Sequence, residues 1–167
     1  MKKLPFLMFL LLIFALTGFD YEPVYYGEYE PIFMLRPEME KNVKTEAPKP
    51  IVNPGKIYIK DQWIFINEKF KGIHVIDNSN PEHPENKYFI TIDGCIDMAI
   101  KNSTLYADNA VDLIAIRLDN GMNSIEVTTR IKDVFPEIPS PDGRDLNWRE
   151  ETAKPEGAIL VRWEKRK

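Results

Sequence analysis

Short runs of apolar residues in the middle of the chain follow the pattern of β-strands. Residues 56–60 alternate between apolar and polar, and residues 63–66 are apolar throughout, as in a strand buried on both faces. Two further apolar runs cover residues 73–76 and 88–92. The segment 77–81 between them is rich in Asp, Asn and Ser, which bond their own backbone in turns. The pattern predicts four short strands joined by turns.

The same plan is repeated further along the chain. Residues 59–67 align with residues 100–108 at an offset of 41, and residues 73–77 align with residues 113–117 at an offset of 40. A β-rich unit that recurs every 40–45 residues or so is the signature of a propeller blade, which has four strands. The second set of strands is predicted at 96–100, 105–107, 113–116 and 125–131.

We therefore predict an all-β fold: two four-stranded antiparallel propeller-type blades that form an incomplete β-propeller, preceded by an extended N-terminal arm. The blades are expected at residues 55–94 and 95–136 of a repeat region 55–136. Residues 137–167 are predicted to be a loop followed by one further strand at 157–163.

The Tyr- and Pro-rich connector, residues 19–54, is expected to be mostly extended because proline fixes φ and removes a donor. One short helix is predicted at residues 37–43, with Pro37 at its first position. The connector's tyrosines are expected to pack on the domain that follows; a carbohydrate-binding strip is the alternative.

Residues 1–18 are predicted to be a signal peptide. Lys2 and Lys3 precede an apolar run from residue 4 to residue 16, which is too short to span a bilayer as a helix. We expect export to the periplasm or cell envelope, with a membrane tether if the signal is not cleaved. Residues 16–18 resemble a lipoprotein signal, but Phe19 stands in the usual place of the lipidated cysteine, so no lipidation is expected.

Charge and cysteine content narrow the classes of partner. The net charge is −4, with no basic cluster, which argues against nucleic acid because phosphate must be neutralised by Lys and Arg. Cys95 is the single cysteine, so no intramolecular disulfide can form. We expect no cofactor and no metal site.

Four carboxylates near predicted strand ends are the weak candidates for ligand binding: Asp93, Asp97, Asp108 and Asp112. The alternative is that they cap turns by accepting backbone N–H groups. Cys95 with His74 or His83 could suggest a nucleophile and a base, but no Cys–His motif surrounds them. We expect Cys95 to be a small buried side chain and His74 to be a hydrogen-bonded residue on one sheet face, and we predict no catalytic residues.

The segment 72–81, Gly-Ile-His-Val-Ile-Asp-Asn-Ser-Asn-Pro, resembles the strand motif and the following turn of the LVIVD-repeat proteins, which are exported bacterial β-propellers. Residues 113–116 fit the motif as well, although Arg117 replaces its Asp. The resemblance covers roughly residues 20–136 and implies a lipoprotein-like propeller without established catalytic residues. Family members are longer, so we expect this chain to correspond to the N-terminal portion, apparently truncated.

The expected function is a non-catalytic binding or scaffold module of the cell envelope whose partner is an unknown protein or carbohydrate. The alternative is a truncated remnant of a longer propeller, or an enzyme with a site at the ring centre. Two blades would leave two outer faces uncovered, and Phe89, Ile90 and Ile92 look too apolar to face solvent. Self-association through these faces is therefore also expected.

The absence of a thiol at position 19 leads to a first prediction. Metabolic labelling with a fatty acid is expected to give no signal for the natural chain, because Phe19 offers nothing to acylate. The variant Phe19→Cys is expected to be labelled if residues 16–18 still direct lipidation. An unlabelled but exported Phe19→Cys variant would show that these residues are an ordinary signal-peptide end.

Overall fold

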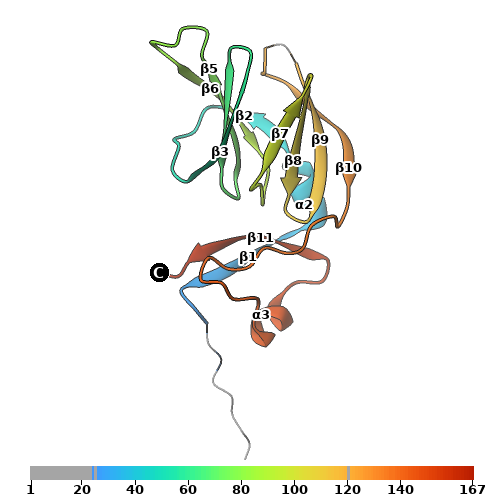
Figure 1. Ribbon diagram of the computed structural model, residues 1–167. Helices are drawn as coiled ribbons and strands as arrows, with labels where there is room; N and C mark the ends of the chain where they lie inside the picture. Colours follow the sequence, from blue (N-terminus) through green and yellow to red (C-terminus); the bar gives the residue numbers. More distant parts are fainter. Residues whose placement is uncertain (1–23, 25, 120) are drawn as a thin grey trace, which may run out of the picture.

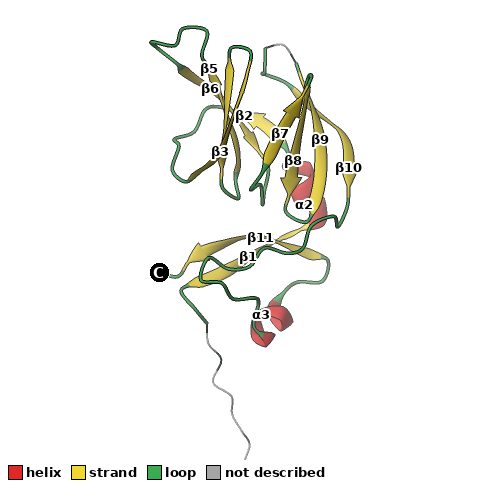
Figure 2. Cartoon of the chain, viewed as in Figure 1, coloured by secondary structure: helices red, strands yellow, loops and turns green. Residues whose placement is uncertain are grey.

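The computed structural model describes residues 24, 26–119 and 121–167 (Figure 1). The predicted signal peptide and Phe19 lie outside the described residues. The described part of the chain is all-β, with several antiparallel sheets and two short helices (Figure 2). None of the sheets closes on itself.

The first sheet is built from consecutive strands: β3 (Pro54–Lys60), β4 (Trp63–Glu68), β5 (Gly72–Asp77) and β6 (Glu85–Thr91). A fifth strand, β2 (Lys44–Glu46), comes from the N-terminal connector and pairs with β6, so the order is β2-β6-β5-β4-β3. The prediction of four strands was therefore one strand short. Strand β2 satisfies backbone groups of β6 that would otherwise form an open sheet edge.

The second sheet has the predicted four strands: β7 (Met98–Lys101), β8 (Thr104–Asn109), β9 (Asp112–Leu118) and β10 (Ile125–Ile131). They are again neighbours in chain order, β10-β9-β8-β7, and all pairs are antiparallel.

The sequence repeat is also a repeat of backbone conformation. Asp61 and Asn102 have φ of 53° and 56°, in the sparsely populated left-handed region, at the offset of 41. Phe70 and Ala110 have φ of 67° and 56° at the offset of 40. A hydrogen bond from Ile92 N–H to the Lys71 carbonyl in the first unit corresponds to one from Val134 N–H to the Val111 carbonyl in the second. The two units therefore fold in the same way.

The two sheets pack face to face around one hydrophobic core. Side chains from the facing surfaces of β4, β5, β6, β8 and β9 meet there with almost no exposure: Phe65, Val75, Ile90, Leu105, Ile114 and Ile116. The first strands of the two sheets also meet, since the Tyr58 hydroxyl donates a 2.8 Å hydrogen bond to the Ile100 carbonyl. The facing surfaces of the two sheets thus share one core.

The connector and the C-terminal segment form a third unit, in which the predicted extended arm is a paired strand and not a free connector. Strand β1 (Tyr29–Leu35) pairs with β11 (Ala158–Lys165) to form a two-stranded antiparallel sheet. Pro31 is tolerated because a strand in a two-stranded ribbon is hydrogen-bonded on only one side. The pairing joins segments from opposite ends of the sequence, so periodicity within the connector could not predict it.

Helix α2 (Arg36–Lys41) follows β1 directly and places Met39 in a second, smaller core beneath the second sheet. The predicted helix at 37–43 is confirmed in position but is shorter, because the chain turns at Asn42 to enter β2. Val111, Ile159 and Val161 belong to the same cluster, so this core joins the third unit to the turn between β8 and β9.

Helix α3 (Trp148–Ala153) lies in the segment that was predicted to be only a loop and a strand. Asn147 caps it: its side chain accepts hydrogen bonds from the N–H groups of Arg149 and Glu150, and the Glu150 side chain accepts from the Asn147 N–H. This reciprocal arrangement is a capping box. The spacing of Asn147 and Glu150 was visible in the sequence and was missed because the surrounding residues are polar.

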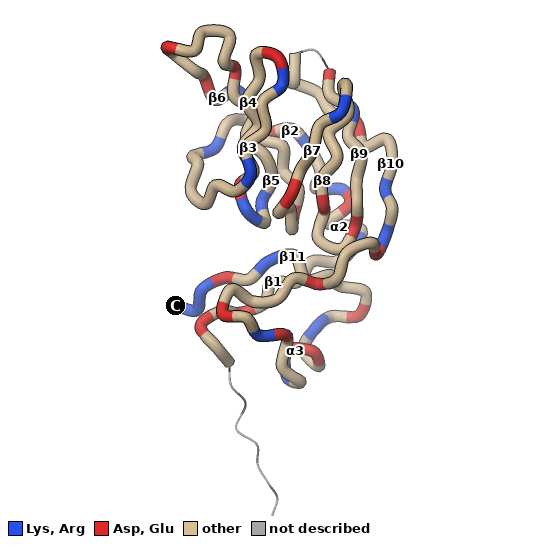
Figure 3. The backbone as a smooth tube through the Cα atoms, viewed as in Figure 1, with Lys and Arg blue, Asp and Glu red and all other residues tan. Residues whose placement is uncertain are grey.

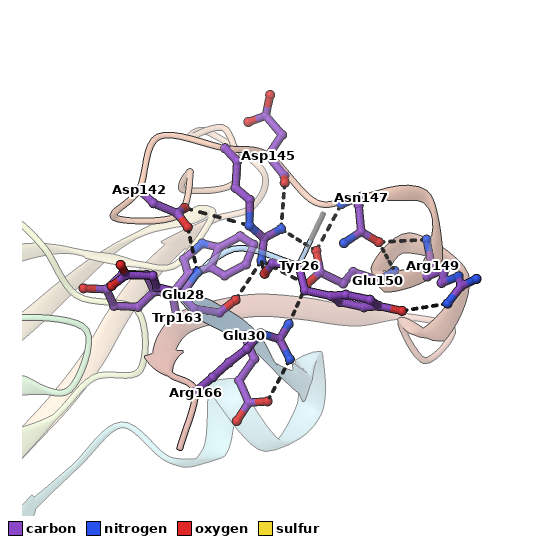
Figure 4. A network of polar contacts seen from close by, with 12 residues as sticks. Tyr26, Glu28, Glu30, Asp142, Asp145, Asn147, Arg149, Glu150, Trp163 and Arg166 are labelled. Atoms are coloured by element: carbon purple, nitrogen blue, oxygen red, sulfur yellow. Dashed lines mark hydrogen bonds and ion pairs between the residues drawn. The ribbon is translucent and has the colours of Figure 1, made fainter. Parts of the chain in front are cut away.

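A network of ionic contacts fastens this helix to β1 and β11 (Figure 4). Arg144 forms a paired contact with Glu150 at 2.6 and 3.0 Å and donates to the carbonyls of Tyr26 and Tyr29. Arg166 contacts Glu150 at 3.1 Å. Burial raises the pKa of Glu150, but hydrogen bonds from Arg144 and Asn147 outweigh burial, and its pKa lies below the ordinary value.

The outer face of the first sheet carries a group of isoleucines that nothing in the described part of the chain covers fully. By strand register this isoleucine face consists of Ile57, Ile59, Ile64, Ile66 and Ile76. Ile57 and Ile59 are 59% and 67% exposed. Phe89, Ile90 and Ile92 were expected to form an uncovered apolar face that drives self-association, but they are buried. Lys49 lies over the Phe89 ring at 4.4 Å, whereas Ile90 and Ile92 point into the shared core.

The isoleucine face is expected to cause reversible self-association of a protein spanning residues 19–167. The double variant Ile57→Ser, Ile59→Ser should weaken association by about tenfold or more in sedimentation velocity experiments, because each buried isoleucine contributes roughly 1.5–3 kcal/mol. Ile131→Ser is the matched control, since Ile131 is 52% exposed on the last strand of the other sheet. A wild-type protein that stays monomeric at all concentrations would contradict the expectation.

Candidate functional site

The four candidate carboxylates do not converge on one site. Asp97 and Asp108 line a cavity beside the second sheet, and Asp93 lines a different cavity beside the first sheet. Asp112 has no exposed surface and is enclosed by two arginines. The structure therefore brings Asp97 and Asp108 together and places Asp93 and Asp112 elsewhere.

Asp108, near the end of β8, caps the turn that leads into β7. Its two oxygens accept hydrogen bonds from Ile96 N–H at 3.0 and 2.9 Å, and one also accepts from Asp97 N–H at 2.7 Å. Burial raises the pKa of Asp108 above its ordinary value, even though these N–H groups favour the charged form. The turn-capping alternative is therefore correct for this residue.

Asp97 connects the two sheets at their first strands. It accepts a 2.6 Å hydrogen bond from Met98 N–H and forms a 2.6 Å ion pair with Lys56 of β3. The hydrogen bond from Lys56 lowers the pKa of Asp97. The side chain remains largely exposed, so the ion pair is accessible from solvent.

The cavity beside Asp97 has a volume of about 440 Å³. It lies on the face of the second sheet that points away from the shared core and is bounded by the loop after β10. The residues that define its character are Lys56, Asp97, Tyr106, Leu113, Phe135 and Ile138. Tyr106 and Phe135 are both about 39% exposed, so two aromatic side chains and one ion pair border a mostly apolar space.

Asp112, the first residue of β9, holds three parts of the chain together. One of its oxygens is 2.8 Å from Arg36 at the start of α2, and the other is 2.8 Å from Arg130 of β10. The Asp133 N–H donates a further bond of 3.1 Å. Burial is the largest single effect and raises the pKa of Asp112, but the hydrogen bonds from Arg36, Arg130 and Asp133 N–H together outweigh it and keep the pKa below its ordinary value.

Cys95 and the histidines do not form a nucleophile and base. Cys95 is fully buried, receives a hydrogen bond from Asn67 at 3.3 Å, and has a pKa raised well above the ordinary value by burial. His74, also fully buried, is 3.1 Å from Glu68. His83 lies exposed in the turn after β5. Cys95 is thus the buried small side chain that was expected.

Glu68, at the end of β4, is a residue that sequence reasoning missed. It is 3% exposed and accepts hydrogen bonds from Val52 N–H at 3.0 Å and Asn53 N–H at 2.6 Å, in addition to its contact with His74. Burial raises its pKa, but these donors outweigh burial and the pKa is lowered. Glu68 therefore fixes the segment before β3 against the sheet. A single Glu after an apolar run gave no signal for this role.

Within the described residues, no group of three or more His, Cys, Asp or Glu side chains is placed to hold a metal ion. None of the helices in the described part of the chain is long and apolar enough to cross a membrane.

Comparisons with known proteins give little additional information. No protein-family profile matches the chain, and no curated protein matches it. One solved structure with partial similarity is the iodide structure of the Trichoderma reesei carbohydrate-active enzyme of family AA12. The TM-score is 0.41 and the identity 13%, over 71% of this chain and 31% of that chain. This chain thus spans about a third of that structure, and a likeness at this level carries no argument about function.

Asp112 is predicted to be the most sensitive of the four carboxylates. Asp112→Asn is expected to lower the free energy of unfolding by about 3 kcal/mol at neutral pH, because Arg36 and Arg130 lose their buried counter-charge. Glu126→Gln, which breaks the exposed pair with Arg117, is the control and should stay close to wild type.

Urea unfolding of the wild type and of Asp112→Asn at a series of pH values should show how the contribution of Asp112 to the free energy of unfolding depends on pH. Since the folded state lowers the pKa of Asp112, its contribution is fully present above the ordinary aspartate pKa of about 4 and is lost as the pH falls further. The difference between wild type and Asp112→Asn should shrink accordingly. A difference that is small at neutral pH or grows on acidification would contradict this account.

Proposed function

We propose that this protein is an exported, non-catalytic binding module of the cell envelope, built from two propeller-type blades, and that its ligand is a carbohydrate. The ligand would bind in the cavity beside Asp97. The observation that carries the proposal is this cavity, in which aromatic side chains flank an accessible ion pair on a repeated β scaffold.

Two features of the fold support propeller-type blades. Each repeat contributes four strands in chain order to its sheet, with β2 added to the first, and the two sheets share a core through their facing surfaces. Propeller blades have this strand order and pack in this way around a central channel. The first strands of the sheets, β3 and β7, approach each other, as strands nearest a common axis would.

The resemblance to LVIVD-repeat proteins supports the same architecture. The motif at residues 72–77 coincides with β5, and its second copy at 113–116 lies within β9. Both are the third strand of their four-stranded repeat. The motif copies thus hold equivalent positions in the two sheets.

A carbohydrate fits the chemistry of the cavity. The apolar face of a sugar ring packs against aromatic side chains such as Tyr106 and Phe135, while its hydroxyl groups bond charged or polar groups at the edge. Asp97 and Lys56 provide one acceptor and one donor of this kind. The volume of about 440 Å³ is in the range of small-molecule sites.

A non-catalytic role is favoured by the way the reactive side chains are used. Asp108 is occupied by backbone N–H groups, and Cys95 is buried with a raised pKa. Positive and negative residues are interspersed along the described chain, apart from the three basic residues 165–167 (Figure 3), and the net charge is −4. This supports the expectation that nucleic acid is not the partner. Export is proposed from residues 1–18 of the sequence.

The proposal is tested by titrating the protein with soluble oligosaccharides of glucose and of N-acetylglucosamine in isothermal calorimetry. Phe135→Ala and Asp97→Asn are each expected to weaken binding about tenfold, a loss of about 1.4 kcal/mol. Trp148→Ala removes an exposed aromatic residue on α3 and should leave binding unchanged. Binding that survives both cavity variants, or that is lost with Trp148→Ala, would contradict the assignment.

A further inference from the structure

A second cavity, of about 410 Å³, lies on the outer face of the first sheet and is separate from the proposed carbohydrate site. Strands β4 and β6, the segment before β3, and β11 of the third unit all contribute to its wall. The charged and polar residues that line it are Lys49, Glu68, Lys71, Thr91, Asp93 and Arg162. Some of their donors and acceptors are occupied by other parts of the protein, and others are available to a ligand.

Two cations on this wall retain free donors. Arg162 of β11 uses Nε for a 2.7 Å bond to Glu164, and its two terminal nitrogens have no partner among the described residues. Within the same part of the chain, no carboxylate lies within ion-pair distance of Lys71. The Arg162 guanidinium and the Lys71 ammonium therefore both line this cavity with N–H groups that are available to a ligand.

Thr91, the last residue of β6, adds a buried hydroxyl. The residue is 8% exposed, and no group in the described structure lies in hydrogen-bonding geometry to its Oγ1. The hydroxyl is close enough to Glu46 to lower the pKa of that carboxyl slightly, but Lys49 and Lys44 dominate there and hold the pKa at about 2. A buried polar group without a partner costs free energy unless a ligand or water satisfies it.

The acceptors on the wall are mostly occupied. Both oxygens of Glu68 accept bonds from Val52 N–H, Asn53 N–H and His74. Lys49 is paired with Glu46 and lies over Phe89, so it contributes little that is free. Asp93 accepts from Asn42 through Oδ2 only, which leaves Oδ1 as the available acceptor. The cavity thus combines several free donors with one free carboxylate oxygen.

We propose that this cavity binds a phosphate group that retains one proton. Arg162, Lys71 and Thr91 donate to the phosphate oxygens, and Asp93 Oδ1 accepts the proton of the phosphate hydroxyl. The charges around the cavity are nearly balanced, so recognition rests on directed hydrogen bonds rather than on net positive charge. Sulfate, which has no proton at neutral pH, would place an unpaired oxygen against Asp93 and is expected to be rejected.

The test is calorimetric titration of the protein with inorganic phosphate, sulfate and glycerol 3-phosphate at neutral pH and low salt, with thermal unfolding as a second readout. Phosphate is expected to bind at least about tenfold more tightly than sulfate and to raise the Tm, because it binds the folded state alone. Glycerol 3-phosphate, a monoester whose second pKa is about 6, is mostly without a proton at neutral pH and is expected to bind more weakly than inorganic phosphate. Tighter binding of the ester would contradict the proton contact with Asp93.

Matched variants separate the site from general charge effects. Arg162→Gln and Lys71→Gln are each expected to weaken phosphate binding about tenfold. Arg117→Gln and Lys101→Gln, on the outer face of the second sheet, make the same changes of charge and should leave it unchanged. Thr91→Val should weaken phosphate binding without lowering the Tm of the free protein, since the hydroxyl it removes has no full hydrogen bond. Asp93→Asn should reduce the preference for phosphate over sulfate.

Several results would overturn the proposal. They are the absence of phosphate binding, equal binding of sulfate and phosphate by the wild-type protein, and an equal loss in the control variants. Full phosphate affinity in Thr91→Val would show that the orphan hydroxyl is only a structural feature. None of these variants touches the cavity beside Asp97, so oligosaccharide binding reports separately on the proposed function.

Discussion

The structure depends on the burial of apolar side chains between two sheets that cannot be stable singly. Each sheet has an apolar inner face, and the only way to remove both faces from water is to place them against each other. Phe65, Ile114 and Ile116 are fully buried at this junction. Each such side chain contributes roughly 1.5–3 kcal/mol, more than any single surface ion pair. The two repeat units therefore depend on each other, because the inner face of each sheet is buried by the inner face of the other.

The third unit is held by a different combination of forces. Its β1–β11 ribbon has only two strands, which are marginal in water without further support. A small core around Met39 and Val161 provides part of that support, and the paired contact of Arg144 with Glu150 provides another. Asp112, between Arg36 and Arg130, then links this unit to the second sheet. Ionic contacts thus fix the position of a unit whose hydrophobic core is small.

The two cavities lie where regular sheets meet irregular segments. The first is bounded by the loop that follows β10, and the second by the segment before β3 and by Arg162 of β11. Binding groups on connecting segments are positioned by the rigid scaffold beneath them. Glu68 performs this positioning directly, because it holds Val52 and Asn53 by their backbone N–H groups. The two proposed sites thus form where the loop after β10, the segment before β3 and strand β11 pack against the sheets of the repeats.

The sequence by itself determined the local features: the strands of the two repeats, the short helix after residue 36, and the burial of Cys95. Alternation and repeat length report them directly, because they depend on neighbours in the chain. Only the tertiary structure decided the pairing of β1 with β11, the addition of β2, and the separation of Asp93 from Asp97. These features join residues far apart in the sequence, so no local pattern encodes them. The same holds for the cavity beside Thr91 and Arg162, whose walls come from four separate segments.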